Sequence, residues 1–311
     1  MYPIKFENLY YHKIWGGQEL KKFRKNLPEG DIGESWDIAC HPNGIGIVSN
    51  GIDKGLTFEQ LIEKHGQNLI GKKINEEKFP LLIKIITAKD KLSIQVHPDD
   101  YYAKKFENEL GKTEAWYILD AEEDSYLILG TKNCDREKFR EALKNNDLEK
   151  YLNKVKVKKG DFFYVQSGLI HGICEGVTIL EVQQSSDTTY RVYDYNRERE
   201  LHIDKALDVI KFSLCAENIK GIEKKYDKVN ITKICEGEFF NIEKYEIFSR
   251  IIETSDENKF FLFTCVCGNG KVISGKTELD VNYGDSFMIP AALGEYELDG
   301  NFTLLKSYVP V

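Results

Sequence analysis

The chain has 311 residues, of which 41% are hydrophobic and 30% are charged, and its formal net charge is −8 at pH 7. This composition is typical of a soluble globular protein with a substantial core. The negative charge argues against general nucleic-acid binding, which requires a basic surface. Because no segment reaches the roughly 18 consecutive apolar residues that span a bilayer, and the first residues lack a signal-peptide core, we expect a cytoplasmic protein without a membrane partner.

Seven cysteines are scattered along the chain without a CxxC pair. An odd number of unclustered cysteines fits reduced thiols in a reducing compartment. Cys265 and Cys267 alternate as strand residues do, which favours core packing over a metal clip.

Short strands and turns fill the first fifty residues, where Trp15 and Glu34 stand out beside flexible glycines. Thr57 and Gln60 form a capping-box pattern, and the apolar residues that follow as far as Ile70 predict a surface helix. The β-branched run 80–88 predicts a buried strand.

The stretch 92–100 places two potential metal ligands on one short strand. Side chains alternate in an extended chain, so Gln95 and His97 point to the same face. Pro98 ends the strand, and Asp99 and Asp100 suit the N-terminus of a short helix. A half-buried strand with a merely hydrogen-bonded histidine is the alternative interpretation of this segment.

The next strand, 112–119, begins with Lys112 and Glu114 on one face, and a further strand follows at 125–130. Apolar residues at helical spacing then predict a charged helix over 135–152 that covers one edge of the β-structure.

The block 155–195 is rich in strand signals and polar residues. A Gly-Asp turn at 160–161 leads into a strand and then to His171. The strand 178–184 carries Glu181, and Arg191 follows among aromatic residues. A closing helix is predicted over 201–214.

From about residue 228 the pattern is almost entirely strand and turn. Tyr283-Gly284-Asp285 and the following strand repeat the pattern of Lys159-Gly160-Asp161. Such an echo suggests two copies of one β-barrel unit. Because no histidine follows His202, we expect the second copy to be metal-free and structural.

Two imidazoles, a carboxylate and an amide carbonyl from Gln95, His97, Glu114 and His171 form a plausible shell for a divalent metal. Imidazoles favour zinc, and the oxygen ligands tolerate a harder ion such as manganese. Lys112 and Arg191 add positive charge, and Glu181 could move a proton. Taken singly, these three residues have plainer interpretations as partly exposed salt bridges and a solvent-facing strand residue.

Four segments in order, 92–99, 111–116, 168–171 and 190–194, closely resemble type I mannose-6-phosphate isomerase in its short bacterial form. The resemblance implies a mainly β fold of two cupin-like (jelly-roll) β-barrel domains, with short helices inserted in and around the N-terminal barrel. It places the catalytic, metal-binding domain at 1–227 and a metal-free domain at 228–311. It also implies one zinc ion per chain and interconversion of mannose 6-phosphate and fructose 6-phosphate.

Site roles also follow from this resemblance, position by position. The implied zinc ligands are Gln95, His97, Glu114 and His171. The implied catalytic residues are Arg191, Lys112 and Glu181, with Arg191 beside the reacting carbons. The implied substrate-binding residues are Ser93 and Lys112, with Trp15 and Glu34 at the entrance.

Two other functions stay open at this point. One is a non-catalytic sugar-phosphate-binding or regulatory cupin, in which the metal only orders the barrel. The other is a metal oxygenase, although Gln95 would occupy a position that such enzymes leave open for oxygen. The sequence does not reveal the oligomeric state, because barrel edge strands can pair between chains or be covered.

Overall fold

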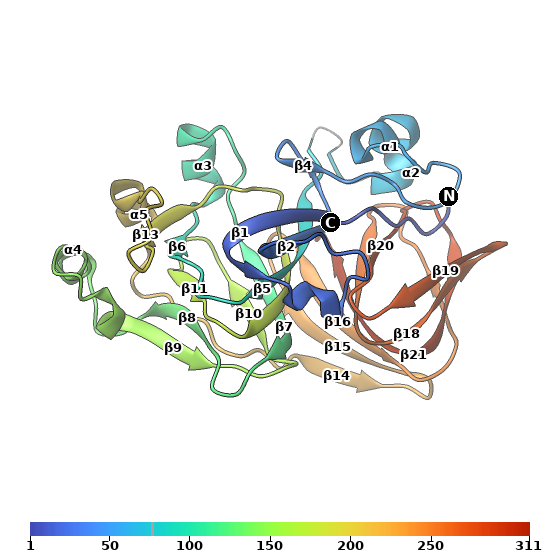
Figure 1. Cartoon of the computed structure of the whole chain (residues 1–311). Coiled ribbons are helices and arrows are strands. Elements are labelled where there is room, and N and C mark those ends of the chain that lie inside the picture. The colour runs from blue at the N-terminus through green and yellow to red at the C-terminus, as the bar shows by residue number, and fades with distance from the viewer. Residues whose placement is uncertain (76–77) are drawn as a thin grey trace.

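The computed structural model describes residues 1–75 and 78–311, and the protein is mainly β with a cupin fold, as expected. In this described part, the strands form two sheets in the first two thirds of the chain and one large sheet in the last third. Figure 1 shows the two groups side by side, with the C-terminal strands in orange and red.

Within each sheet the strands lie side by side in the following order. The six-stranded sheet contains β1 (Leu9–Gly17), β2 (Ile32–Ile38), β5 (Leu81–Ala88), β12 (Val177–Gln184), β7 (Glu114–Ala121) and β10 (Phe162–Val165). The five-stranded sheet contains β13 (Tyr190–Tyr193), β6 (Ile94–Val96), β11 (His171–Ile173), β8 (Tyr126–Thr131) and β9 (Leu152–Lys156). The C-terminal sheet contains β14 (Ile222–Lys225), β15 (Val229–Glu236), β16 (Asn241–Ile247), β21 (Glu295–Tyr308), β18 (Phe261–Ser274) and β19 (Thr277–Asn282), with β17 (Ile251–Thr254) on β21 and β20 (Ser286–Ile289) on β18. A small hairpin joins β3 (Cys40–His41) and β4 (Gly44–Ile45).

The helices are short and lie around the sheets (Figure 1). They are α1 (Phe58–His65), α2 (Gln67–Ile70), α3 (Asp100–Phe106), α4 (Arg136–Lys144) and α5 (Ile203–Val209), with 3₁₀ turns η1 (Glu19–Lys22) and η2 (Leu148–Tyr151). None of the described helices is long and apolar enough to cross a membrane. All seven cysteines are free.

Two helix N-caps predicted from the sequence are confirmed. Thr57 and Gln60 form a reciprocal capping box at α1, and the Asp99 side chain accepts a hydrogen bond from Tyr102 N at α3. Each cap satisfies a backbone N–H that the helix itself leaves free.

Three helix lengths were predicted wrongly. The helix after Thr57 breaks at Gly66, whose φ of 49° leaves the helical region. The helix predicted over 135–152 ends at Lys144, because Asn146 takes a positive φ of 55° and the chain re-enters a sheet at Leu152. The helix predicted over 201–214 spans only Ile203–Val209.

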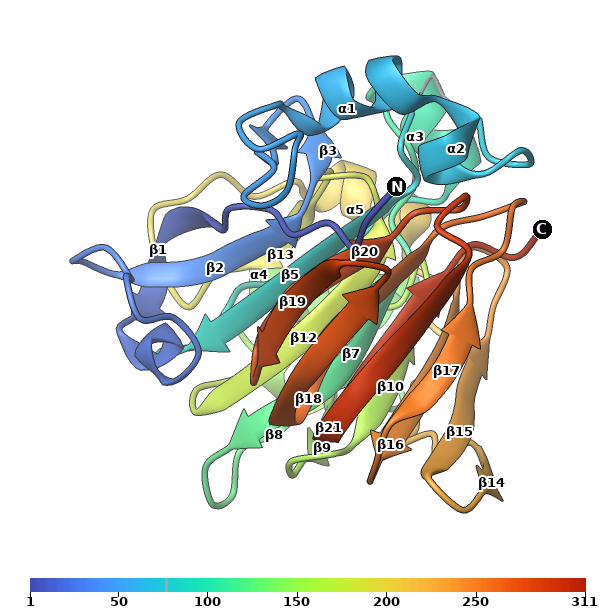
Figure 2. The same ribbon diagram turned by 90° about the vertical axis from the view of Figure 1, so that its right-hand side faces the viewer.

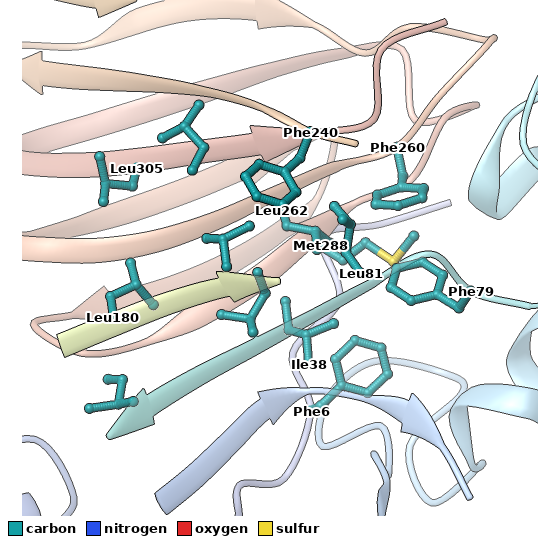
Figure 3. Packing of buried hydrophobic residues seen from close by; sticks show 14 of the residues in the cluster. Phe6, Ile38, Phe79, Leu81, Leu180, Phe240, Phe260, Leu262, Met288 and Leu305 are labelled. Carbon is teal, nitrogen blue, oxygen red and sulfur yellow. The ribbon is translucent and has the colours of Figure 1, made fainter. Parts of the chain in front are cut away.

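The main core lies between the six-stranded sheet and the C-terminal sheet. Figure 3 shows Ile38, Leu81 and Leu180 of the first sheet facing Leu262 and Leu305 of the second. All five are at most 2% exposed, and each buried side chain of this size contributes about 1.5–3 kcal/mol. Figure 2 shows the C-terminal strands in front of β5, β12 and β7, so this contact joins the two halves of the chain.

A buried polar network crosses the same contact. The Arg24 guanidinium donates to both carboxylate oxygens of Asp37 at 2.7 Å and to Gly284 O at 2.8 Å. Ser286 Oγ donates to Asp37 Oδ2 at 2.9 Å. The η1–β2 region is therefore fixed to the turn before β20 by satisfied, buried hydrogen bonds.

The echo between the two Gly-Asp turns extends to their hydrogen bonds. Lys158 N donates to Asp161 Oδ2 at 3.0 Å, and Asn282 N donates to Asp285 Oδ2 at 2.9 Å. The backbone pair between Asp161 and Ile118 on β7 is repeated between Asp285 and Cys265 on β18. The antiparallel strand pair β7–β10 thus has a counterpart in the pair β18–β20, in agreement with the echo seen in the sequence.

Candidate functional site

Strand register aligns polar side chains on the face of the six-stranded sheet that is opposite the main core. Glu181 on β12 pairs with Lys84 on β5 and with Trp116 on β7, while Gln183 pairs with Glu114. Because neighbouring residues alternate faces, these side chains point away from the core that Leu180 and Val182 enter. They face the five-stranded sheet instead.

Gln95 lies in the middle of the opposing row. It pairs with His171 on β11 and with Arg191 on β13. The register therefore brings three predicted site residues from distant parts of the chain into one line across the five-stranded sheet.

His97, Glu114 and His171 converge between the two sheets. Their potential ligand atoms all lie within 4.8 Å of one another, and each residue is 1% exposed. His97 Nε2 lies 3.1 Å from Glu114 Oε1 and 3.2 Å from His171 Nε2. Gln95 Nε2 lies 3.4 Å from His171 Nε2. The four residues form one compact cluster.

The hydrogen bonds around this cluster leave its inner atoms available to a metal ion. Nδ1 of His97 faces Thr188 O at 2.8 Å, and Nδ1 of His171 faces Leu169 O at 2.8 Å. Each Nδ1 therefore carries a proton, and each Nε2 offers a lone pair to the centre. Neither carboxylate oxygen of Glu114 has a hydrogen bond of good geometry from the described residues, and its close cationic neighbour is the Lys112 ammonium, 3.0 Å from Oε1. Imidazole nitrogens and a carboxylate are a donor set that a divalent metal takes.

Burial and neighbouring charges set the ionisation of the cluster. Burial, followed by the charge of Lys112, lowers the pKa of His97 to about 3, and burial also lowers the pKa of His171. Burial alone would raise the pKa of Glu114, but Lys112 and then His97 hold it well below its usual range. Neutral imidazoles and an ionised carboxylate are the forms that bind metals.

A second group of charges lies beside the cluster. Lys84 Nζ lies 3.8 Å from Glu34 Oε2 and 3.8 Å from Glu181 Oε1. Trp116 Nε1 donates to Glu181 Oε2 at 2.9 Å, whereas Oε1 accepts no hydrogen bond from any described residue. Burial, with a smaller contribution from the nearby Glu114 charge, raises the pKa of Glu181 to about 7. This carboxyl can hold or release a proton near neutral pH.

Basic groups complete the surroundings. Lys112 Nζ lies 3.0 Å from Glu114 Oε1. Arg191 Nε donates to Ser93 Oγ at 3.3 Å, and Arg191 Nη1 donates to Glu200 O at 2.8 Å. Positive charge thus lies on two sides of the cavity between the sheets, which has a volume of about 300 Å³.

The structure brings the predicted site residues together. The following predicted residues line this cavity: Trp15, Glu34, Ser93, Gln95, Lys112, Glu114, Glu181 and Arg191. His97 and His171 are buried directly against Glu114.

Four charged residues that line the cavity were missed from the sequence: Lys13, Lys84, Asp187 and Arg199. A signal existed for Lys84, because it is the one charged residue within the aliphatic strand Leu81–Ala88. Lysines are almost never fully buried without a partner.

The fold and the site together define a cupin-type protein with a group that could bind a metal ion in the first two thirds of the chain. Residues 4–131 match the family profile of the phosphomannose isomerase type I catalytic domain, and residues 230–309 match the mannose-6-phosphate isomerase cupin domain. The chain belongs to the type I mannose-6-phosphate isomerase family.

Similar proteins cover the whole chain. It is 38% identical to mannose-6-phosphate isomerase ManA of Bacillus subtilis over 99% of both chains. It is 36% identical to mannose-6-phosphate isomerase of Streptococcus mutans over 98% of both. The crystal structure of mannose 6-phosphate isomerase from Bacillus subtilis superimposes with a TM-score of 0.93 and 34% identity, over 99% of this chain and 100% of that one.

Proposed function

We propose that this protein interconverts mannose 6-phosphate and fructose 6-phosphate through an enediol, with one zinc ion as cofactor. One observation supports this function above all. The His97, Glu114 and His171 cluster borders, through Glu114, the cavity that is also lined by a carboxyl with a pKa near neutral pH and by two buried or half-buried cations.

Gln95, His97, Glu114 and His171 would hold the metal. A half-turn of the Gln95 amide about its last bond would present its carbonyl oxygen in place of the nitrogen now 3.4 Å from His171 Nε2. When bound, a zinc ion supplies Lewis-acid stabilisation of negative charge on the substrate oxygens.

Glu181 is the candidate for proton transfer between carbons. Its free Oε1 would take the proton from C2 of open-chain mannose 6-phosphate as the enediol forms and would return it to C1, while a proton passes from O2 to O1. Trp116 holds the other oxygen, so the carboxyl has a fixed orientation. A raised pKa suits a base that must also act as an acid in the reverse direction.

Lys112 and Arg191 would stabilise the charge that develops on the substrate oxygens. Ser93, which accepts a hydrogen bond from Arg191, would bind a hydroxyl or the phosphate together with Lys112. Trp15 and Glu34 would contact the sugar at the entrance. The catalytic role belongs in this proposal to the N-terminal domain, 1–227, and the structural role to 228–311.

The decisive experiment is a coupled assay of mannose 6-phosphate conversion on purified protein, before and after chelation and with zinc added back. We expect turnover that disappears with the chelator and returns with zinc. Stoichiometric metal without turnover would instead support a sugar-phosphate-binding cupin, and iron-dependent oxygen uptake would support a metal oxygenase.

Location in the cytoplasm is also a proposal. It rests on the seven unpaired cysteines, which suit a reducing compartment. Fractionation of the native cells would test it.

A further inference from the structure

A second and larger cavity lies outside the site described above. Its volume is about 570 Å³, and its walls come from the β3–β4 hairpin, helix α1 and the segments around Phe79 and Glu109. None of its lining residues lines the first cavity. The two cavities are therefore separate potential binding sites.

His41 lines this cavity and has a buried ring nitrogen, Nε2, without a hydrogen-bond partner among the described residues. The residue is 5% exposed, and its Nδ1 accepts a hydrogen bond from Asn43 N at 3.1 Å. The neutral ring therefore carries its proton on Nε2. That buried atom makes no hydrogen bond within the described part of the chain, because Glu109 Oε1, its nearest acidic oxygen, is 3.7 Å away. A ligand acceptor would remove this deficit.

Carboxylates dominate the charge of the cavity. Glu59 and Glu63 lie one turn apart on α1, so both are on the face that lines it, and Glu109 adds a third. Lys78 is the only cation among the described lining residues. The excess of negative charge favours a cationic ligand and disfavours sugar phosphates.

The floor of the cavity is apolar. Ile62 and Phe79 are buried and line it together with Pro42. An occupant therefore needs an apolar body as well as a charged group.

We propose that this cavity binds a small organic cation that has an apolar body and a neutral oxygen acceptor. The cation would lie among the carboxylates of α1 and Glu109, and the acceptor would receive the Nε2 proton of His41. A metal ion fits less well, because Nε2 holds a proton in this tautomer and has no lone pair to offer.

The ligand site would share a wall with the first cavity. Asn43, whose N–H fixes the His41 ring, also donates through Nδ2 to Asp187 Oδ2 at 2.9 Å, and Asp187 lines the first cavity. Ser185 lines the second cavity two residues earlier. Asn43 thus connects the two cavities, because it makes one hydrogen bond to His41 of the second cavity and one to Asp187 of the first.

The test is isothermal titration of the full-length protein with tyramine, which has an aromatic body, an ammonium group and a phenolic oxygen. Two matched compounds separate the contributions. Phenethylamine lacks the oxygen and should bind about two- to tenfold more weakly, the range of one hydrogen bond. 4-Ethylphenol lacks the cation and should bind at least about fivefold more weakly.

Variants locate the binding. Glu59→Gln and Glu63→Gln, at solvent-exposed positions on the face of α1 that lines the cavity, should each weaken tyramine binding about two- to fivefold. Glu137→Gln is the control, because Glu137 lies in the first turn of α4 as Glu59 does in α1. His41→Phe should reduce the affinity for tyramine to that for phenethylamine. Should that variant fail to fold, the two α1 variants still decide the question.

The same titration at saturating mannose 6-phosphate completes the test. Binding of tyramine that persists there and weakens in the α1 variants supports the proposal. The proposal is overturned by absence of saturable binding, by affinities that the α1 variants leave unchanged, or by full displacement by mannose 6-phosphate. Because turnover is not measured, this result is independent of the isomerase assay.

Discussion

His97 Nε2 and His171 Nε2 lie 3.2 Å apart, although each ring uses its Nδ1 proton for a backbone carbonyl. Two lone pairs at this distance repel each other unless a cation lies near both. The two carbonyls, at Thr188 and Leu169, thus fix the tautomers that a metal requires. Several measurable consequences follow from this arrangement and from the contacts around it.

Glu114→Gln should release the metal. The change removes the one carboxylate of the cluster, and we expect metal affinity to fall by at least about 100-fold, since even supporting residues cost 10- to 100-fold. Metal analysis after dialysis would measure this. The control is Glu278→Gln at an exposed position of β19 in the C-terminal sheet, which should retain full metal content. Full metal content in Glu114→Gln would exclude this residue as a ligand.

Glu181→Gln should lower kcat by about 10²- to 10⁴-fold with little change in KM, because a general base acts mainly on the chemical step. Steady-state kinetics at saturating zinc would show this. Glu175→Gln, at the exposed turn before β12, is a matched control and should be as active as the unmodified protein. Nearly normal turnover of Glu181→Gln would remove Glu181 from this role.

The pH dependence should have a definite sign. A base must be ionised, so kcat/KM should rise with pH through the pKa of Glu181. In the metal-free protein, burial and the Glu114 charge raise that pKa from 4.5 to about 7. A bound dication would offset the effect of Glu114, so the inflection should lie between these two values. The Glu181→Gln variant should lack this acidic limb.

The stability of the metal-free protein should also depend on the ionisation of Glu181. Unlike the activity, it should fall as the pH rises. Between pH 4.5 and about 7 the folded state holds a proton that the unfolded state has lost. The free energy of unfolding should therefore fall as the pH rises through this window, relative to Glu181→Gln. Urea unfolding of both proteins at several pH values measures the difference, and parallel curves would contradict the raised pKa.

Asp37→Asn should destabilise the protein by about 3–5 kcal/mol, because it leaves the buried Arg24 charge unpaired. Chemical unfolding would measure the loss. Asp120→Asn, at the exposed pair with Lys22, should change stability little. If Asp37→Asn unfolded like the control, the network between the two halves would have no energetic role.

Lys306→Met should leave isomerase activity unchanged. Ile118 and Cys265 are equivalent residues, because each makes the backbone pair with the aspartate of a Gly-Asp turn. Glu181 pairs with Trp116, two residues before Ile118, and Lys306 pairs with Phe263, two residues before Cys265. Lys306 is therefore the counterpart of Glu181. The Lys306 ammonium lies 3.9 Å from the ring centroid of Phe261, and burial lowers its pKa. Replacing a buried charge with an apolar side chain is often neutral or stabilising. Loss of turnover in a stable Lys306→Met protein would contradict a purely structural C-terminal domain.

Features that depend only on neighbouring residues, such as strand alternation and helix caps, were predicted correctly from the sequence. Alternation placed Gln95 and His97 on one face, and the caps at Thr57 and Asp99 were recognised because capping needs only neighbouring residues. The helix over 135–152 was too long, since the positive φ of Asn146 is decided by the return of the chain to a sheet.

Register between distant strands could not be read from the sequence. It places Lys84 beside Glu181, and the sequence showed Lys84 only as an interruption of an aliphatic strand. His41 was missed for a similar reason, because its free Nε2 becomes evident only once Asn43 and Glu109 are located in space.

The repeated Gly-Asp turns lie at the contact between the two parts of the chain. Lys159 and Tyr283 occupy equivalent places before the two Gly-Asp turns, and the Lys159 ammonium lies 4.9 Å from the centre of the Tyr283 ring. Leu180 and Leu305, also equivalent by register, lie in one core (Figure 3). Equivalent residues that meet each other are the mark of an isologous interface around a two-fold axis. The contact between the two parts of the chain therefore resembles an isologous interface, and among the described residues the His97, Glu114 and His171 group lies on only one side of it.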